Sequence, residues 1–144
     1  MHRHHGRVLV LLEPHTGVAI LPGGAPEVQD QDDPASTLRR EAEAEAVARI
    51  GSPLLLGYVT GPGMQRGYLR YAAALTNVGP AQPDPATGHT YTRILATREQ
   101  ATELFDWEPA TADQLAAVHE ARRQFGLPRA PRQPFSELTT PTAW

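Results

Sequence analysis

The stretch Leu21–Gly51, LPGGAPEVQDQDDPASTLRREAEAEAVARIG, holds most of the information about fold and function in this chain. Its Gly-Gly turn is followed by an acidic loop and then by a segment that contains Arg40, Glu41 and Glu45. Glycines let the backbone approach a ligand closely, and carboxylates are ligands that hard divalent cations prefer. This order of parts suits the binding of a divalent metal together with a phosphate.

The segment after the acidic loop has the features of a helix. Asp33 is a favoured N-cap, Pro34 fits the first helical position, and Gly51 is a typical stop. We therefore predict a helix over residues 34–50.

The predicted helix places two of its acids on one face. With about 100° per residue, Glu41 and Glu45 point in nearly the same direction, whereas Glu43 points away from both. The pair could share a magnesium ion, and Arg40 could orient a carboxylate through paired hydrogen bonds. The alternative needs no metal, because two like charges at this spacing on an exposed helix cost only roughly 0.2–0.5 kcal/mol.

The composition fits a single domain and excludes several kinds of chemistry. The 144 residues include no cysteine and no lysine, and the net charge is −3. Thiolate nucleophiles, disulfides, cysteine-bound zinc and lysine Schiff bases are therefore excluded. The weakly acidic balance argues against a nucleic-acid partner, and no apolar run suggests a membrane span or a secretory signal. We expect a cytoplasmic protein.

The rest of the chain alternates between predicted strands and helices. This order predicts an α/β fold, a sandwich with a central mixed sheet, over residues 1–126. Residues 127–144 contain several prolines and are expected to form an extended tail packed on or near the domain. The predicted strands are 7–13, 18–21, 54–60, 68–76 and 90–96, and the other predicted helices are 97–105 and 111–126.

The order of residues from Leu21 onward resembles the Nudix hydrolase family. The family signature runs G-x5-E-x7-R-E-U-x-E-E-x-G-U, where U is a bulky aliphatic residue. The match lies in Gly24, in Arg40 followed by Glu41, and in Glu45. The resemblance implies a Nudix-like α/β/α sandwich.

The chain also departs from this signature. Asp30 has the family spacing from Gly24, whereas Asp32 has the family spacing to Arg40, so the loop is two residues longer. Three further positions are substituted: Ala42 replaces the bulky aliphatic residue, Ala44 replaces the first of the paired glutamates, and Val47 replaces the glycine.

The resemblance implies a metal-dependent pyrophosphohydrolase that cleaves the diphosphate bond of a small nucleoside diphosphate derivative. Magnesium, or manganese in its place, would be bound by Glu41 and Glu45, with the Gly24 carbonyl and Asp32 as further ligands. Arg40 would orient a glutamate. Arg40, Glu41 and Glu45 are therefore the candidate catalytic residues.

Three questions stay open. The substituted signature also fits a catalytically impaired Nudix-like domain with a nucleotide-binding or regulatory role. The general base is undefined, because the later loop over 84–91 offers only Asp84. The family usually has a strand before the one predicted at Arg7, and a partner copy could supply it, which leaves a homodimer open.

Aromatic and histidine side chains supply weaker candidates. Tyr58, Tyr68 and Trp107 could stack on a base, although a single aromatic residue is more often part of the core. The N-terminal histidines, His2, His4 and His5, could chelate a transition metal. His15, His89 and His119 are predicted to be surface or structural residues.

Overall fold

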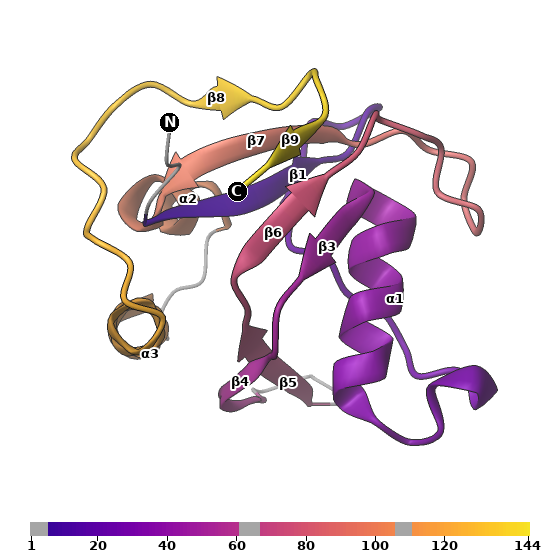
Figure 1. The fold of residues 1–144 in the computed structure, drawn as a ribbon, viewed down its shortest axis with the longest axis horizontal. Helices are drawn as coiled ribbons and strands as arrows, with labels where there is room; N and C mark the ends of the chain where they lie inside the picture. The colour runs from indigo at the N-terminus through magenta and orange to yellow at the C-terminus, as the bar shows by residue number, and fades with distance from the viewer. Residues whose placement is uncertain (1–5, 61–66, 106–110) are drawn as a thin grey trace.

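The protein combines helices with antiparallel β-sheets, which confirms the α/β class (Figure 1). The computed structural model describes residues 6–60, 67–105 and 111–144. The elements are β1 (Arg7–Leu12), β2 (Ala19–Ile20), the short 3-10 helix η1 (Val28–Asp30), α1 (Pro34–Ala46), β3 (Ala48–Ile50), β4 (Leu54–Val59), β5 (Tyr68–Ala72), β6 (Leu75–Val78), β7 (Thr92–Thr97), α2 (Arg98–Phe105), α3 (Thr111–Gln124), β8 (Ser136–Glu137) and β9 (Thr142–Ala143).

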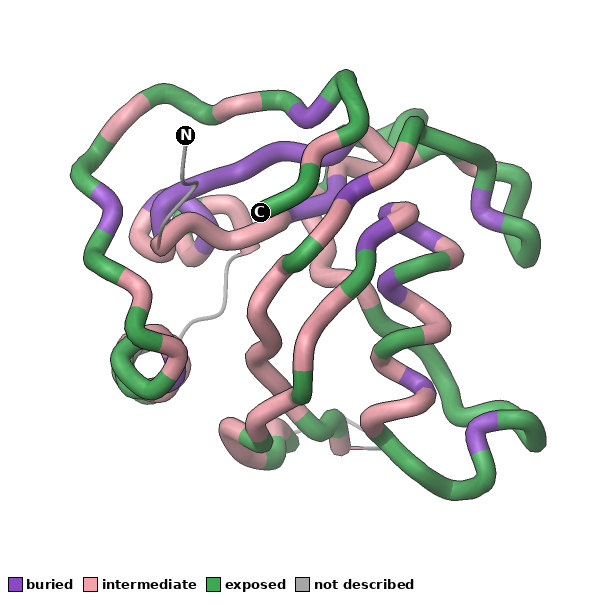
Figure 2. The backbone as a smooth tube through the Cα atoms, viewed as in Figure 1, coloured by how far each residue is buried: buried purple, intermediate pink, exposed green. Residues whose placement is uncertain are grey.

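The most buried part of the molecule is the pair of strands β1 and β7. They run antiparallel along their whole length, from Arg7 opposite Thr97 to Leu12 opposite Thr92. Their sheet has the order β2-β1-β7-β8, and β7 is buried over nearly its full length (Figure 2). The apolar character of both strands is therefore explained by burial on two faces.

The remaining strands form two smaller sheets, β3-β6-β9 and the hairpin β4-β5. Every pairing among the described strands is antiparallel. The prediction of a mixed sheet was therefore wrong for this part of the chain. Alternating strands and helices suggest parallel crossovers, but α1 leads from β2 into β3, which belongs to a different sheet, so it connects no parallel neighbours.

The helices cover different parts of this framework. α1 lies alongside β3, α2 packs on β1 and β7, and α3 contacts α2 and β4 (Figure 1). The C-terminal segment returns over the sheets, where β8 pairs with β7 and β9 pairs with β6. No helix in the described residues has the length and apolar character that a membrane crossing requires.

Two predicted helix starts are confirmed in atomic detail. Asp33 accepts a hydrogen bond from the backbone N–H of Ala35 at 3.1 Å, and Pro34 occupies the first helical turn of α1. At the start of α2, Thr97 and Gln100 exchange hydrogen bonds: each backbone N–H donates to the other side chain, at 2.8 and 3.2 Å. Both motifs satisfy N–H groups that have no partner within the helix.

The predicted end of the first helix was wrong. α1 ends at Ala46 rather than near residue 50, and 48–50 form strand β3. Val47 adopts a left-handed conformation with φ of 52°, and its N–H caps the carbonyls of Ala42 and Glu43. A glycine would adopt this conformation freely, whereas valine does so at a steric cost.

A buried arginine fixes the end of α1 to the sheets. Arg93 of β7 is only 2 % exposed and donates to the carbonyls of Ala46 (2.9 Å), Gly79 (2.7 Å) and Leu138 (3.0 Å). Burial lowers the pKa of its guanidinium. These bonds join the helix, the segment after β6 and the C-terminal tail, so Arg93 helps to set where α1 lies.

We expect Val47→Gly to be more stable than Val47→Ala by about 1 kcal/mol, because only glycine relieves the left-handed strain. Both variants lose the packing of the valine side chain, so the comparison isolates the backbone term. Urea denaturation of the two proteins measures the difference. Equal stabilities, or the order typical of a helix interior in which alanine is better, would show that the left-handed turn is not present in solution.

Candidate functional site

Arg40 of α1 ties the acidic loop to the helix. Its Nε donates to Asp30 Oδ1 at 3.1 Å, and its Nη2 donates to Asp30 Oδ2 at 3.0 Å and to the Ala25 carbonyl at 2.9 Å. Asp30, which is 3 % exposed, also accepts from the Glu27 N–H (2.8 Å) and the Thr37 hydroxyl (2.9 Å). These donors, Arg40 foremost, lower the pKa of Asp30 to about 2. Asp30 is therefore a fixed structural carboxylate.

Asp32 is not brought into this network. It is exposed, and among the described residues its side chain makes no hydrogen bond or ion pair. Gln31 and Asp32 both have left-handed backbones, with φ of 53° and 57°. They form the turn between η1 and α1. The acid beside Arg40 is therefore Asp30, and the structure gives no support to Asp32 as a metal ligand.

Glu41 lies between Arg40 and the Gly-Gly turn. Arg40 Nη1 donates to Glu41 Oε1 at 2.6 Å, and the carboxylate is partly buried. Gly24 packs directly against it, because a Cβ atom at Gly24 would collide with the Glu41 carboxylate. A glycine at this position lets the backbone approach the acid closely.

Glu45 is one turn further along α1 and is buried. Only 7 % of it is exposed, and its Oε1 accepts a hydrogen bond from the Gly23 N–H at 2.9 Å. Burial, followed by the nearby charges of Glu41 and Asp84, raises the pKa of Glu45 to about 7 against the opposing effect of the Gly23 bond. At neutral pH this carboxyl is thus poised between its two protonation states. Such poised groups are common in binding and catalytic sites.

Asp84 supplies a third acid from the loop between β6 and β7. It is 6 % exposed, and its carboxylate accepts from the Ala86 N–H and the Thr87 hydroxyl, both at 3.0 Å. Its charge also raises the pKa of Tyr91, after burial and the charge of Glu45. The loop therefore brings Asp84 to the same acidic region as the two helix carboxylates. By contrast Glu43 is exposed, on the other side of α1.

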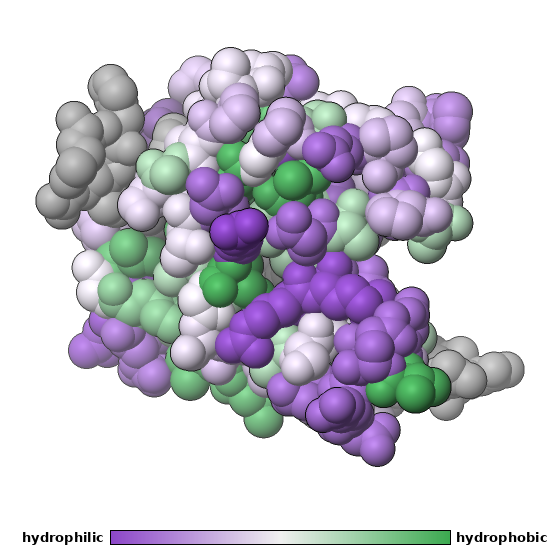
Figure 3. All heavy atoms as spheres, turned by 45° about the vertical axis from the view of Figure 1, so that its right-hand side comes forward, coloured by the Kyte–Doolittle hydropathy of each residue, from purple (hydrophilic) through white to green (hydrophobic). Residues whose placement is uncertain are grey.

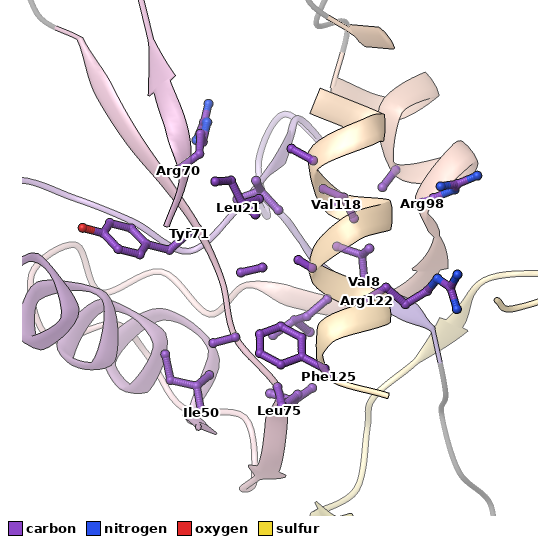
Figure 4. A pocket seen from close by; sticks show the side chains of 18 of the residues that line it. Val8, Leu21, Ile50, Arg70, Tyr71, Leu75, Arg98, Val118, Arg122 and Phe125 are labelled. Atoms are coloured by element: carbon purple, nitrogen blue, oxygen red, sulfur yellow. The ribbon is translucent and has the colours of Figure 1, made fainter. Parts of the chain in front are cut away.

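Hydrophilic residues gather over the side of the molecule formed by α1 (Figure 3). A cavity of about 860 Å³ lies behind this helix, lined mostly by apolar side chains from the sheets and α3 (Figure 4). Leu38 and Ala42 of α1 line it, whereas Glu41 and Glu45 do not. Pro22 lines the cavity, and the N–H of the next residue, Gly23, donates to Glu45, so adjacent residues contact the cavity and this acid.

Aromatic side chains differ in their positions. Tyr58 lines the cavity and is nevertheless 63 % exposed, and Tyr68 is exposed as well, so neither is a core residue. Trp107 and the N-terminal histidines lie outside the described residues. Tyr58 is therefore one of the aromatic residues that line the cavity, whereas Tyr68 does not line it.

We find no family model, curated protein or solved structure that matches this chain.

Proposed function

We propose that this protein is a metal-dependent, Nudix-type hydrolase that cleaves the diphosphate bond of a small nucleoside diphosphate derivative. The observation that carries the proposal is the pair Glu41 and Glu45 on one face of α1, each held by a separate donor. Burial, followed by the negative charges of Glu41 and Asp84, raises the pKa of Glu45. A divalent cation would neutralise this charge, and a carboxylate pair with few other donors suits magnesium or manganese.

Glu41 and Glu45 would hold the metal, with the Gly24 carbonyl beside them. When bound, the metal would activate a water for attack on phosphorus and neutralise the charge that develops. Arg40 would keep Glu41 in place through its hydrogen bond, while Asp30 keeps Arg40 in place. Asp84 is the best candidate to accept a proton from the attacking water, because it is the loop acid whose charge raises the pKa of Glu45.

The cavity behind the Gly-Gly turn offers a place for the nucleoside part of such a substrate. It is mostly apolar, has Tyr58 among its lining residues, and includes Pro22, whose neighbour Gly23 donates to Glu45. Ligand pockets are typically apolar with a few polar groups at one side. This arrangement supports a substrate whose apolar or aromatic part is joined to a diphosphate.

A substrate screen tests the proposal. Nucleoside triphosphates, nucleotide sugars, ADP-ribose and dinucleoside polyphosphates are incubated with Mg²⁺ or Mn²⁺, and the products are separated by chromatography. We expect metal-dependent cleavage of at least one class, and a loss on the order of 100-fold in kcat for Glu45→Gln with little change for the exposed control Glu43→Gln. Cleavage that Glu45→Gln leaves unchanged would contradict the assignment of the site.

A second candidate function is a nucleotide-binding or regulatory domain without efficient catalysis. Ala44 favours it, because this position lacks the acid of the family signature and its methyl group cannot bind a metal. Isothermal titration with the same nucleotides distinguishes the two. Binding without cleavage would support the second function, and cleavage would support the first.

A further inference from the structure

A second cluster of metal-binding side chains lies apart from the α1 acids. Glu13, His15 and His89 each offer a ligand atom, and these atoms lie within 4.8 Å of one another. The first two residues follow β1, and the third lies in the loop between β6 and β7. We propose that these residues bind a transition-metal dication of the zinc class.

The carboxylate of Glu13 is already oriented by its own turn. Its Oε2 accepts hydrogen bonds from the His15 N–H (3.0 Å), the Thr16 N–H (2.6 Å) and the Thr16 hydroxyl (2.7 Å). The Gly17 N–H closes the turn on the Glu13 carbonyl at 2.8 Å. These donors hold one oxygen, so Oε1 is the oxygen that faces His89. Ligating carboxylates are commonly fixed by second hydrogen bonds in this way.

His89 is held with similar firmness. Its carbonyl accepts from the Asp84 N–H at 2.8 Å, its N–H donates to the Thr87 hydroxyl at 3.2 Å, and Gly88 N–H bonds back to the Asp84 carbonyl at 2.7 Å. The loop is therefore closed on itself, and it presents the ring toward the Glu13 turn. Both sets of ligands come from turns that are preorganised by their own backbone bonds.

The spacing of the donor atoms fits a small tetrahedral ion. His89 Nδ1 and Glu13 Oε1 are 3.6 Å apart, and two ligands of tetrahedral zinc are separated by about 3.3 Å when their bonds to the metal are about 2.0–2.1 Å long. The ligand atom of His15 lies within 4.8 Å of the other two. Its exposed ring meets that of His89 edge to face, with centroids 5.1 Å apart. Three protein ligands leave the fourth position for water.

The donor set separates this site from the α1 acids. Two imidazoles and one carboxylate favour zinc, nickel or copper over magnesium, which prefers oxygen ligands. The inference therefore does not depend on the proposed hydrolase function. A metal here would join the turn after β1 to the loop that carries Asp84. Without a metal, the same residues would form only a weak Glu13–His89 ion pair and a ring contact.

Zinc binding is tested on the full chain in which His2, His4 and His5 are changed to alanine, so that the N-terminal histidines do not compete. Zn²⁺ is titrated against a chromophoric chelator at pH 7.5. We expect one zinc ion per chain, and at least a tenfold weaker affinity in His15→Ala and in His89→Ala. The matched control His119→Ala, which changes a histidine on α3, should bind zinc like its parent.

His15 is exposed, so His15→Ala is the variant that tests the site without disturbing the fold. Near-ultraviolet circular dichroism of each variant checks that the fold is retained. Zinc affinity that is unchanged in both His15→Ala and His89→Ala would overturn the proposal. Loss of zinc binding in Glu41→Gln with retention in His15→Ala would also overturn it, because the ion would then belong to the α1 acids.

Discussion

Glu45→Gln is expected to raise the free energy of unfolding of the metal-free protein at pH 8 by up to about 3 kcal/mol while it removes magnesium binding. The pKa of Glu45 rises from 4.5 to about 7 in the folded protein, chiefly through burial. Each pKa unit corresponds to roughly 1.4 kcal/mol. The amide has no charge to bury, and its carbonyl can still accept the Gly23 N–H.

The pH dependence follows from the direction of this shift. Between about pH 4.5 and pH 7 the folded protein retains the Glu45 proton, whereas the unfolded chain has lost it, so the parent loses stability as the pH rises. Above pH 7 the folded protein bears the full cost of burying the charged Glu45 carboxylate. In Glu45→Gln this decrease should be absent. Urea denaturation at pH 5 and pH 8 measures it, with the exposed Glu43→Gln as control. Parallel pH profiles for Glu45→Gln and its parent would contradict the burial of a charged Glu45.

Asp30→Asn should have the opposite effect and destabilise the protein by about 3 kcal/mol or more at pH 7. Asp30 is buried, and it balances the guanidinium of Arg40 through paired hydrogen bonds. An uncharged amide leaves Arg40 without this partner and turns an N–H₂ group toward its donors. Arg40 would then also hold Glu41 less firmly, so we expect weaker metal binding as well. The matched control is Asp32→Asn, which should change stability by less than about 0.5 kcal/mol.

Acid titration supplies a second measure of the Asp30 contact. The pKa of Asp30 is lowered from 3.8 to about 2, so its contribution to stability is present above about pH 4 and is lost as the pH falls through 2. Asp30→Asn should lack this part of the acid unfolding profile. Equal destabilisation by Asp30→Asn and Asp32→Asn would show that the loop register in solution differs from the one described.

Local signals in the sequence were sufficient for several elements. The caps at Asp33 and Thr97 act within three residues, so residue type and spacing identify them. The predicted end of α1 was wrong because local signals do not determine it. A β-branched residue is rarely left-handed, and nothing local in the sequence shows that Val47 takes that conformation. Packing against distant groups, including the Arg93 bond to Ala46, sets the end of the helix.

In the candidate site, too, local sequence determines some features and distant contacts determine others. The Glu41–Glu45 face could be predicted because helix geometry alone determines it. The choice between Asp30 and Asp32 depended on how the loop before α1 folds, and the spacing of residues in the sequence allowed both. His15 and His89 are far apart in sequence and meet only because the turn after β1 and the loop after β6 lie side by side. A single sequence carries no signal of that contact.

The most direct test of the central assignment is Mn²⁺ titration at pH 8, followed by the electron paramagnetic resonance signal of the free ion. The parent should bind Mn²⁺, and Glu41→Gln and Glu45→Gln should each bind it at least about tenfold more weakly. His15→Ala should bind it like the parent, because its site lies apart from these acids. Unchanged Mn²⁺ binding in both glutamine variants would contradict the account of Glu41 and Glu45 as the metal ligands.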